Sequence, residues 1–244
     1  RRPPHQAVRR REDRGMTTIR SIDFETTGIP SEADPQAIVE IGWQDIEYDG
    51  MGWAGLVPEG RGSFLCNPGR PIPHEAMAVH HITDEMVADA SGNVGLIGAP
   101  DYFCAHNADY ERQFHNPGVP YICTYKVALR LWPEAPSHGL QFLRYHLNLP
   151  VVSAEAFPPH RAGPDAYLGA ALMVRILEEG RASLEEMVRW SNGPALLPRV
   201  NFGKHKGAKW EDVPLDYLEW VANKSDLDRD VKANARHHLK ARAA

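Results

Sequence analysis

Two acidic residues near the N-terminus, Asp23 and Glu25, give the first indication of chemistry in this sequence. They lie at the end of a β-compatible run and shortly before Gly28. Side chains at positions i and i+2 of a β-strand point to the same face, so the two carboxylates converge. Hard oxygen ligands on one face supply half of a divalent-metal site. A solvated strand edge can show the same spacing, and two further segments decide between these interpretations.

A second segment with chemical potential follows the apolar run at residues 102–105. We predict that Asn107 is the N-cap of a helix, because Asn is a favoured residue at that position. Asp109 is then expected in the first helical turn, where the helix dipole stabilises an anion. The alternative is that Asp109 is only a favourable first-turn acid.

The third segment combines a histidine with an acid. Asp165 follows His160 by five residues and is expected in or next to the first turn of a strongly apolar helix. A single histidine in a loop is usually only solvated. In a chain that already carries two acidic segments, this spacing favours a base beside a third acidic position.

Together the segments form the ordered set Asp-x-Glu, His-Asn-x-Asp and His-x4-Asp. This set resembles the three exonuclease motifs of the DEDD family, in the DnaQ-like subclass that uses histidine as its base (DEDDh). A bacterial exodeoxyribonuclease branch of the family is the most similar, with matching stretches at residues 72–80, 82–89, 122–124, 129–133 and 202–207. The resemblance runs from about Met16 to the late C-terminus and implies a 3′→5′ exonuclease.

The residue types indicate the same chemistry. Four carboxylates from one strand and two helix starts can hold two Mg2+ ions, for which Mn2+ substitutes, and such a pair clamps the attacking and leaving oxygens of a phosphoryl displacement. Asp23 is the expected bridging ligand, and Glu25 and Asp165 complete one metal. Asp109 is expected to support the other metal, and neutral His160 to take the proton from the attacking water. The resemblance implies release of a nucleoside 5′-monophosphate from a 3′ end.

Several residues near these motifs are candidate substrate contacts: Phe24, Thr26, Thr27, His80, His106 and Asn107. Phe24 and Thr27 are favoured because the backbone after the first ligands must approach the terminal nucleotide, and an aromatic ring can stack on a base. For His80 the alternative is a capping role at the end of a helix. Glu40 could also face the site, or it could be a half-buried strand residue with a local partner.

Composition sets the broad class of protein. With 244 residues and 43% hydrophobic content, the chain has room for one large domain and a small appendage. Its three cysteines are odd in number and lack Cys-x-x-Cys spacing, so neither a disulfide framework nor a zinc site is indicated. Apolar runs fall short of a membrane span, and we expect a cytoplasmic protein with no membrane contact.

The hydrophobic pattern predicts an α/β fold. Short β-type runs lie at residues 19–24, 37–48 and 63–66, with turn residues between them, and these suggest an antiparallel meander. Further strands are predicted at 102–105 and 121–124, and helices at 127–131, 139–147, 165–179 and 183–190. The resemblance implies a ribonuclease-H-like mixed sheet flanked by helices.

Charge and turn residues divide the chain into four parts. Residues 1–15 are Arg-rich and lack periodicity, and they are predicted to be a disordered arm or an upstream extension before Met16. Residues 16–190 form the predicted exonuclease domain, 191–198 a linker, and 199–244 a small basic module. Residues 16–198 hold 11 Lys and Arg against 23 Asp and Glu, whereas residues 199–244 hold 10 against 7.

The basic module is predicted to begin with a tight hairpin at residues 203–207, followed by helices at 216–222 and 230–241. We predict that Lys204, Lys206 and Lys209 contact nucleic-acid phosphates, since an acidic catalytic domain repels DNA. The alternative is a packing appendage with Trp210 and Trp220 as its core.

The expected function is therefore that of a metal-dependent 3′→5′ exodeoxyribonuclease acting on single-stranded or duplex 3′ ends in DNA repair or recombination. The motifs determine the reaction and not the sugar, so a 3′→5′ exoribonuclease remains an alternative. A polymerase proofreading subunit and a non-catalytic nucleic-acid-binding protein are further alternatives. The sequence identifies no protein partner.

Overall fold

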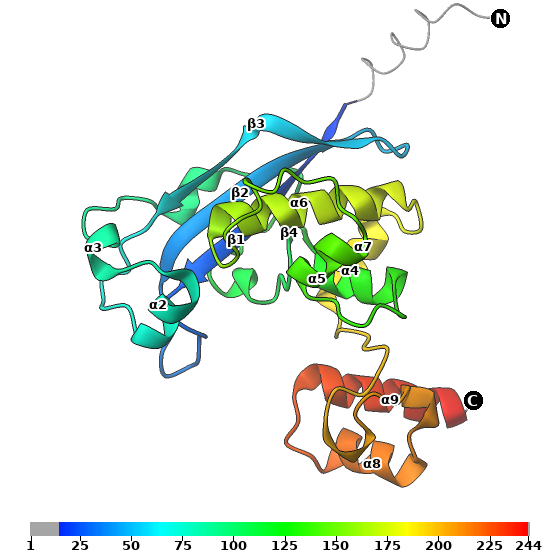
Figure 1. The fold of residues 1–244 in the computed structure, drawn as a ribbon. Helices are drawn as coiled ribbons and strands as arrows, with labels where there is room; N and C mark the ends of the chain where they lie inside the picture. The colour runs from blue at the N-terminus through cyan, green and yellow to red at the C-terminus, as the bar shows by residue number, and fades with distance from the viewer. Residues whose placement is uncertain (1–14, 244) are drawn as a thin grey trace, which may run out of the picture.

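A computed structural model describes residues 15–243 and shows a mixed five-stranded sheet covered by helices, followed by a smaller C-terminal lobe (Figure 1). All of the predicted N-terminal extension except Gly15 lies outside the described residues. The strands are β1 (Thr17–Thr26), β2 (Ile38–Tyr48), β3 (Ala54–Leu65), β4 (Tyr102–Ala105) and β5 (Tyr121–Cys123). Their order in the sheet is β3-β2-β1-β4-β5.

The first three strands form the predicted antiparallel meander, and β4 and β5 run parallel to β1. The predicted mixed sheet with flanking helices is therefore confirmed. The prediction for β3 was too short, because the strand begins at Ala54 and not at residue 63. Its early part contains Pro58 and three glycines, which favour turns when taken alone, but pairing with β2 overrides that local preference.

The main body contains eight helical segments: α2 (His74–His80), α3 (Asp84–Val87), η1 (Val94–Ile97), η2 (Glu111–Gln113), α4 (Thr124–Leu131), α5 (Leu140–His146), α6 (Ala162–Glu178) and α7 (Leu184–Asn192). The C-terminal lobe adds η3 (Gly203–His205), η4 (Trp210–Asp212), α8 (Leu215–Asn223) and α9 (Arg229–Ala243). Within residues 15–243, the structure shows no helix with both the length and the apolar character that a membrane crossing requires.

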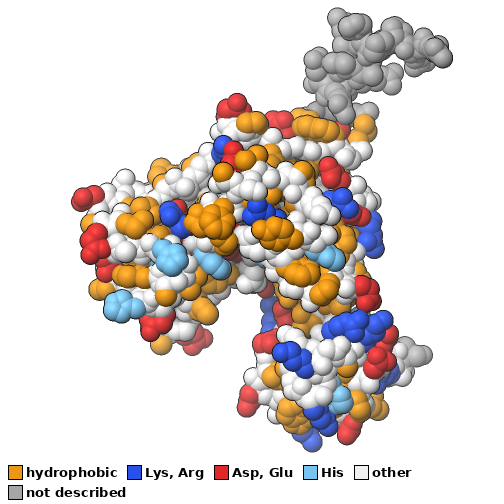
Figure 2. All heavy atoms as spheres, in the orientation of Figure 1, with side chains coloured by type: hydrophobic (Ala, Val, Ile, Leu, Met, Phe, Trp, Pro, Cys, Tyr) orange, Lys and Arg blue, Asp and Glu red, His pale blue; other side chains and the backbone are white. Residues whose placement is uncertain are grey.

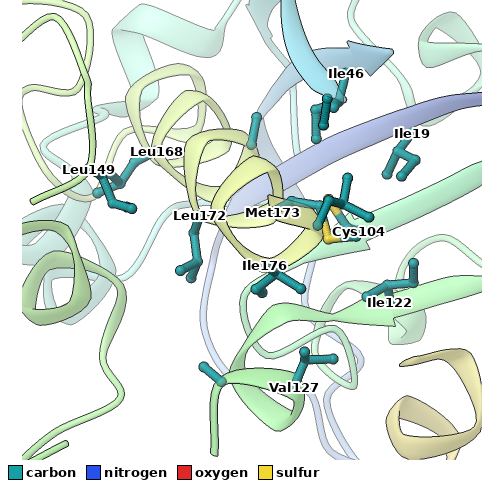
Figure 3. Close-up of a cluster of buried hydrophobic side chains, with 14 of the residues drawn as sticks. Ile19, Ile46, Cys104, Ile122, Val127, Leu149, Leu168, Leu172, Met173 and Ile176 are labelled. Carbon is teal, nitrogen blue, oxygen red and sulfur yellow. The ribbon is translucent and has the colours of Figure 1, made fainter. Parts of the chain in front are cut away.

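Alternation along β1 separates two apolar clusters on the two faces of the sheet. On one face, Ile19 belongs to the same cluster as Leu168 and Leu172 of α6 (Figure 3). Ile22 and Phe24 pack with the cluster on the opposite face. Asp23 shares the odd-numbered positions of β1 with Ile19, so its side chain lies on the face that α6 covers.

The C-terminal lobe has its own apolar cluster, centred on Trp210, which is 1% exposed. Trp220 is 44% exposed and lies outside that cluster. The predicted hairpin at residues 203–207 is confirmed as a chain reversal, because the Val200 N–H donates to the Ala208 carbonyl at 2.9 Å and the Gly207 N–H donates to the Val200 carbonyl at 2.8 Å. Its tip contains the 3-10 helix η3, with φ of 59° at Gly203 and 89° at Gly207. One isolated bridge, between Arg199 and Lys209, closes this loop.

Polar contacts join the lobe to the main body. Arg199 and Lys209 approach Glu134 at 3.2 and 3.8 Å. Asn234 of α9 donates to the Ala195 carbonyl at 2.7 Å and accepts from the Leu197 N–H at 2.9 Å. The amide oxygen and the amide nitrogen of Asn234 therefore both bond α9 to the linker.

Candidate active site

Three carboxylates meet where the end of β1 lies beneath the start of α6. Ligand oxygens of Asp23, Glu25 and Asp165 all lie within 4.8 Å of one another. The two β1 residues are brought together by the period of the strand, and Asp165 is in the first turn of α6, as predicted. Hard oxygen donors from three side chains at this spacing suit a divalent cation such as Mg2+.

The loop before α6 orients the third carboxylate. The Asp165 Oδ2 atom accepts a hydrogen bond from the His160 backbone N–H at 2.7 Å, and Oδ1 accepts one from Gln141 Nε2 at 3.1 Å. His160 has a φ of 60° and an exposed side chain. The backbone of His160 therefore holds Asp165, while its imidazole stays available to a ligand.

Burial and mutual repulsion make the ionised cluster unfavourable without a cation. Burial is the main cause that raises the pKa of Asp23 well above its ordinary value, and repulsion by Asp165 and Glu25 adds to it. Burial, and then Asp165 and Glu40, raise the pKa of Glu25 to about 8. Burial also raises the pKa of Asp165, although hydrogen bonds from His160 and Gln141 partly offset this. A bound cation would relieve this repulsion, so the residues fit a metal site.

The segment after β4 departs from the prediction. Asn107 is not the N-cap of an α-helix: its φ is 80°, and turns lead from it to the short 3-10 helix η2. A side-chain N-cap typically has extended backbone angles, whereas this left-handed residue reverses the chain. Asp109 consequently lies apart from the cluster and pairs with Lys126 Nζ at 2.6 Å.

The same turn brings Glu111 towards the site instead. Glu111 is 3% exposed, and its Oε2 atom is buried with no hydrogen-bond partner among residues 15–243. Burial raises its pKa to about 8, with repulsion from Asp109 and Glu25 adding to the effect. Glu111 in turn contributes to the raised pKa of Asp23.

Glu111 is not among the residues predicted from the sequence, although its spacing gives a signal. Asp109 and Glu111 have the same two-residue spacing as Asp23 and Glu25, so either acid of the second pair could face the site. The choice depends on the backbone turn at Asn107, which sequence spacing does not reveal.

The predicted substrate contacts near β1 are largely occupied by the protein itself. Phe24 is 4% exposed and packs edge-on against Phe114 in the core, on the face opposite the carboxylates. Its predicted stacking role is therefore not supported. The Thr26 hydroxyl bonds to Tyr110 and to the Gly28 carbonyl. The Thr27 hydroxyl donates to Gln36 Oε1 at 2.7 Å.

The two predicted contact histidines are also engaged. His80 is 2% exposed, and its Nδ1 atom accepts the Ile82 N–H at 3.0 Å, which matches the capping alternative. His106 places its ring nitrogens 3.1 Å from Thr124 Oγ1 and 2.9 Å from the His138 carbonyl. Burial lowers the pKa of His106 to about 4, so the neutral form is favoured at neutral pH.

The three lysines of the C-terminal lobe have different surroundings. Lys204 Nζ lies 5.1 Å from the centre of the Tyr217 ring. Lys209 lies 3.8 Å from Glu134 and 3.9 Å from Glu211. Lys206 is exposed and lines a cavity of about 340 Å³, which also contacts the main body at residues 125–138.

Comparison with known proteins identifies the family to which this chain belongs. The chain belongs to an exonuclease family, whose model, described as "Exonuclease", matches residues 21–173. Exodeoxyribonuclease 10 of Escherichia coli strain K12 is 32% identical over 230 residues, covering 91% of this chain and 98% of that protein. DNA polymerase III subunit epsilon of Treponema pallidum strain Nichols is 26% identical, covering 72% of this chain and 84% of that protein.

Solved structures agree with this assignment. The structure of Exonuclease X in complex with 5′-overhanging duplex DNA has a TM-score of 0.60 and 33% identity, covering 71% of this chain and 99% of that chain. The nuclease domain of 3′hExo, a DEDDh family member bound to rAMP, has a TM-score of 0.50 and 16% identity, covering 68% of this chain and 94% of that chain. The predicted membership in an exonuclease family is therefore confirmed, and so is the ribonuclease-H-like fold that DEDDh exonucleases share.

Removing one of the mutually repelling carboxylates should raise the melting temperature of the metal-free protein. We expect Asp23→Asn to raise the melting temperature in chelator at pH 8, by roughly 2–4 °C per kcal/mol of repulsion removed. Groups whose pKa rises on folding bind more protons in the folded state, so metal-free wild type should lose stability as pH increases from the ordinary Glu value of 4.5 to about 8. Thermal unfolding at several pH values, with and without Mn2+, measures both effects.

Asp89→Asn is the matched control, because Asp89 is an exposed aspartate. It should leave the melting temperature and its Mn2+ dependence unchanged, whereas Mn2+ should stabilise wild type more than Asp23→Asn. An equal Mn2+ shift in wild type and Asp23→Asn would contradict the metal site.

Proposed function

We propose that this chain is a metal-dependent 3′→5′ exodeoxyribonuclease that releases nucleoside 5′-monophosphates by two-metal hydrolysis in DNA repair or recombination. The convergence of Asp23, Glu25 and Asp165 beside the exposed His160 carries this proposal. DNA is favoured as substrate because the relatives with 32% and 33% identity are an exodeoxyribonuclease and a nuclease solved with DNA. We also propose a cytoplasmic location, which suits the three buried free cysteines.

Four carboxylates are proposed to hold the metals. Asp23, Glu25 and Asp165 form one group, and Glu111 replaces Asp109 as the fourth ligand because its buried Oε2 atom has no hydrogen-bond partner within residues 15–243 and its charge raises the pKa of Asp23. Bound Mg2+ or Mn2+ supplies charge neutralisation and Lewis acidity for phosphodiester hydrolysis. The buried, preorganised oxygens hold that charge without rearrangement during the reaction.

His160 is proposed to accept the proton of the attacking water. Its side chain is exposed, while its backbone N–H is bonded to Asp165 at 2.7 Å, so the base and a ligand belong to one rigid unit. This hydrogen bond fixes the backbone from which the imidazole extends next to Asp165. Asp165 also lies close enough to stabilise the imidazolium that forms after proton transfer.

The C-terminal lobe is proposed to contact the nucleic-acid backbone. Residues 199–244 carry a net charge of +3, whereas residues 16–198 carry −12. Figure 2 shows Lys and Arg side chains interspersed with Asp and Glu on the visible face of this lobe. Lys206 is well suited to phosphate contact because it is exposed beside the cavity that adjoins the main body.

The activity is tested with 3′-labelled single-stranded and duplex DNA and with RNA, each in Mg2+ and in chelator. We expect mononucleotides from DNA with a free 3′-hydroxyl, no product in chelator, and survival of a closed circle. Preference for RNA would support the exoribonuclease alternative, and cleavage of the circle would overturn the exonuclease mechanism.

His160→Ala excludes contaminating nucleases in the same assay. It should lower kcat by about 10²- to 10⁴-fold while Mn2+ binding stays intact, because the side chain acts on a proton and not on the metal. If the wild-type protein binds DNA but does not degrade it, the result would support the alternative of a non-catalytic nucleic-acid-binding protein.

The fourth carboxylate is tested by a pair of variants. Glu111→Gln should lower kcat and Mn2+ affinity, by about 10-fold or more, because an amide replaces an anionic oxygen at the cluster. Asp109→Asn should instead lower the free energy of unfolding by about 1–3 kcal/mol, because buried Lys126 loses a carboxylate partner. Its Mn2+ affinity should remain that of wild type. Mn2+ titration and chemical denaturation separate the two effects, and the opposite pattern would return Asp109 to the metal site.

The lobe is tested by combining Lys204→Ala, Lys206→Ala and Lys209→Ala. If three phosphate contacts are lost on a single strand, the slope of log affinity against log salt should fall by about two. The control combines Lys224→Ala, Lys232→Ala and Lys240→Ala, which removes the same charge from the same lobe. Equal salt slopes in the two triple variants would favour the packing-appendage alternative.

A further inference from the structure

The start of α6 is held by a side chain from β2. Glu40 is 3% exposed, and its Oε2 atom accepts hydrogen bonds from Arg161 Nε at 2.8 Å and from the Ala162 N–H at 3.0 Å. Its Oε1 atom accepts a hydrogen bond from Arg161 Nη2 at 2.8 Å. Both carboxylate oxygens are therefore used at the point where α6 begins.

This arrangement replaces the usual helix cap. The N-cap residue, Arg161, makes no side-chain capping hydrogen bond, so the free N–H of Ala162 is satisfied by Glu40. A carboxylate at this end also complements the helix dipole. The first turn of α6 is consequently attached to the sheet through Glu40, in addition to the hydrogen bond between Asp165 and the preceding loop.

A glycine on the same strand permits this close approach. A Cβ atom at Gly42 would lie 2.1 Å from the Ala162 backbone, so any side chain there would displace the first turn of α6. In the β1–β2 register, Gly42 pairs with Asp23 and Glu40 pairs with Glu25. The two β2 residues that receive α6 are thus the direct neighbours of the two β1 carboxylates.

The arrangement is poorly explained by stability alone. Glu40 adds a negative charge beside the carboxylate cluster, and Arg161 only partly compensates for it. Buried ion pairs are often no more stabilising than apolar residues of similar volume. Because Glu40 places its negative charge beside four carboxylates, the position of the Glu40–Arg161 pair is better explained by the way it fixes the start of α6.

We infer that Glu40, Gly42 and Arg161 form a seat that sets the position of His160 and Asp165 against the β1 carboxylates. The three seat residues are positioning residues, because they act through the start of α6 and not on substrate. His160 directly precedes Arg161, and its backbone N–H holds Asp165, so displacement of the seat moves the base and a ligand together. This inference rests on the proposed nuclease function.

Glu40→Gln tests the seat, because it retains the shape of the side chain and removes its charge. We expect kcat on 3′-labelled DNA and Mn2+ affinity each to fall by about 10- to 100-fold, as for partners that orient metal ligands. KM for DNA should stay close to that of wild type, since the seat does not contact the strand. Mn2+ affinity is measured by titration without substrate, so this readout does not depend on turnover.

Asp45→Asn is the matched control on the same strand. Asp45 forms a comparable two-point pair with Arg20, at 2.6 and 2.7 Å, and is 9% exposed. This variant should lower the melting temperature while leaving kcat and Mn2+ affinity unchanged. Equal losses of kcat in Glu40→Gln and Asp45→Asn would show a purely structural role and overturn the inference.

Two further variants keep the test decisive if Glu40→Gln does not fold. Arg161→Lys preserves the charge but not the two-point contact, and Gly42→Ala preserves every hydrogen-bonding group while displacing α6. Each variant should lower kcat and Mn2+ affinity. If either variant folds and keeps the wild-type values of both, the inference is wrong. If wild type degrades neither DNA nor RNA but the variants still lose Mn2+ affinity, the proposed function fails and the seat stands.

Discussion

Repulsion between carboxylates in a desolvated site is the constraint on which the rest of this structure depends. The half-buried carboxylates of Asp23, Glu25 and Asp165 converge within a few ångströms, and Glu111 adds a buried acid nearby. Burial raises the pKa of all four, and repulsion from neighbouring carboxylates raises the pKa of Asp23, Glu25 and Glu111 further. An isolated helix or hairpin could not hold these groups together. The sheet and α6 must supply the free energy that keeps them in place until a cation binds.

The packing of α6 on the sheet meets this requirement. Its apolar face covers Ile19 and its neighbours, while small residues permit close approach at two points along the helix. Gly42 lies beneath its first turn, and a Cβ atom at Gly169 would lie 2.8 Å from Ser21 Oγ. Close backbone contact leaves little freedom for the helix to slide or tilt. The same contacts that bury the core therefore determine where Asp165 meets the β1 carboxylates.

The sequence predicted those parts of the site that depend on local periodicity. Asp23 and Glu25 follow from the period of a strand, and Asp165 follows from the start of an apolar helix. The predicted N-cap at Asn107 is wrong because the positive φ of this residue leads into turns and not into an α-helix. The early part of β3 was missed because its partner strand outweighs its glycines. Long-range pairing and backbone handedness are the features that residue spacing does not encode.

Asp109 and Glu111 illustrate how one turn serves two purposes. Glu111 is buried and raises the pKa of Asp23, while Asp109 binds Lys126, which also donates to the Ser191 carbonyl at 3.1 Å and the Gly193 carbonyl at 2.8 Å. These carbonyls lie where α7 ends and the linker to the C-terminal lobe begins. Because Lys126 is buried and makes all three contacts, the turn that holds the fourth carboxylate and the start of the linker share one anchor. Asp109, which sequence spacing predicts as a metal ligand, is therefore tied through Lys126 to the start of the linker.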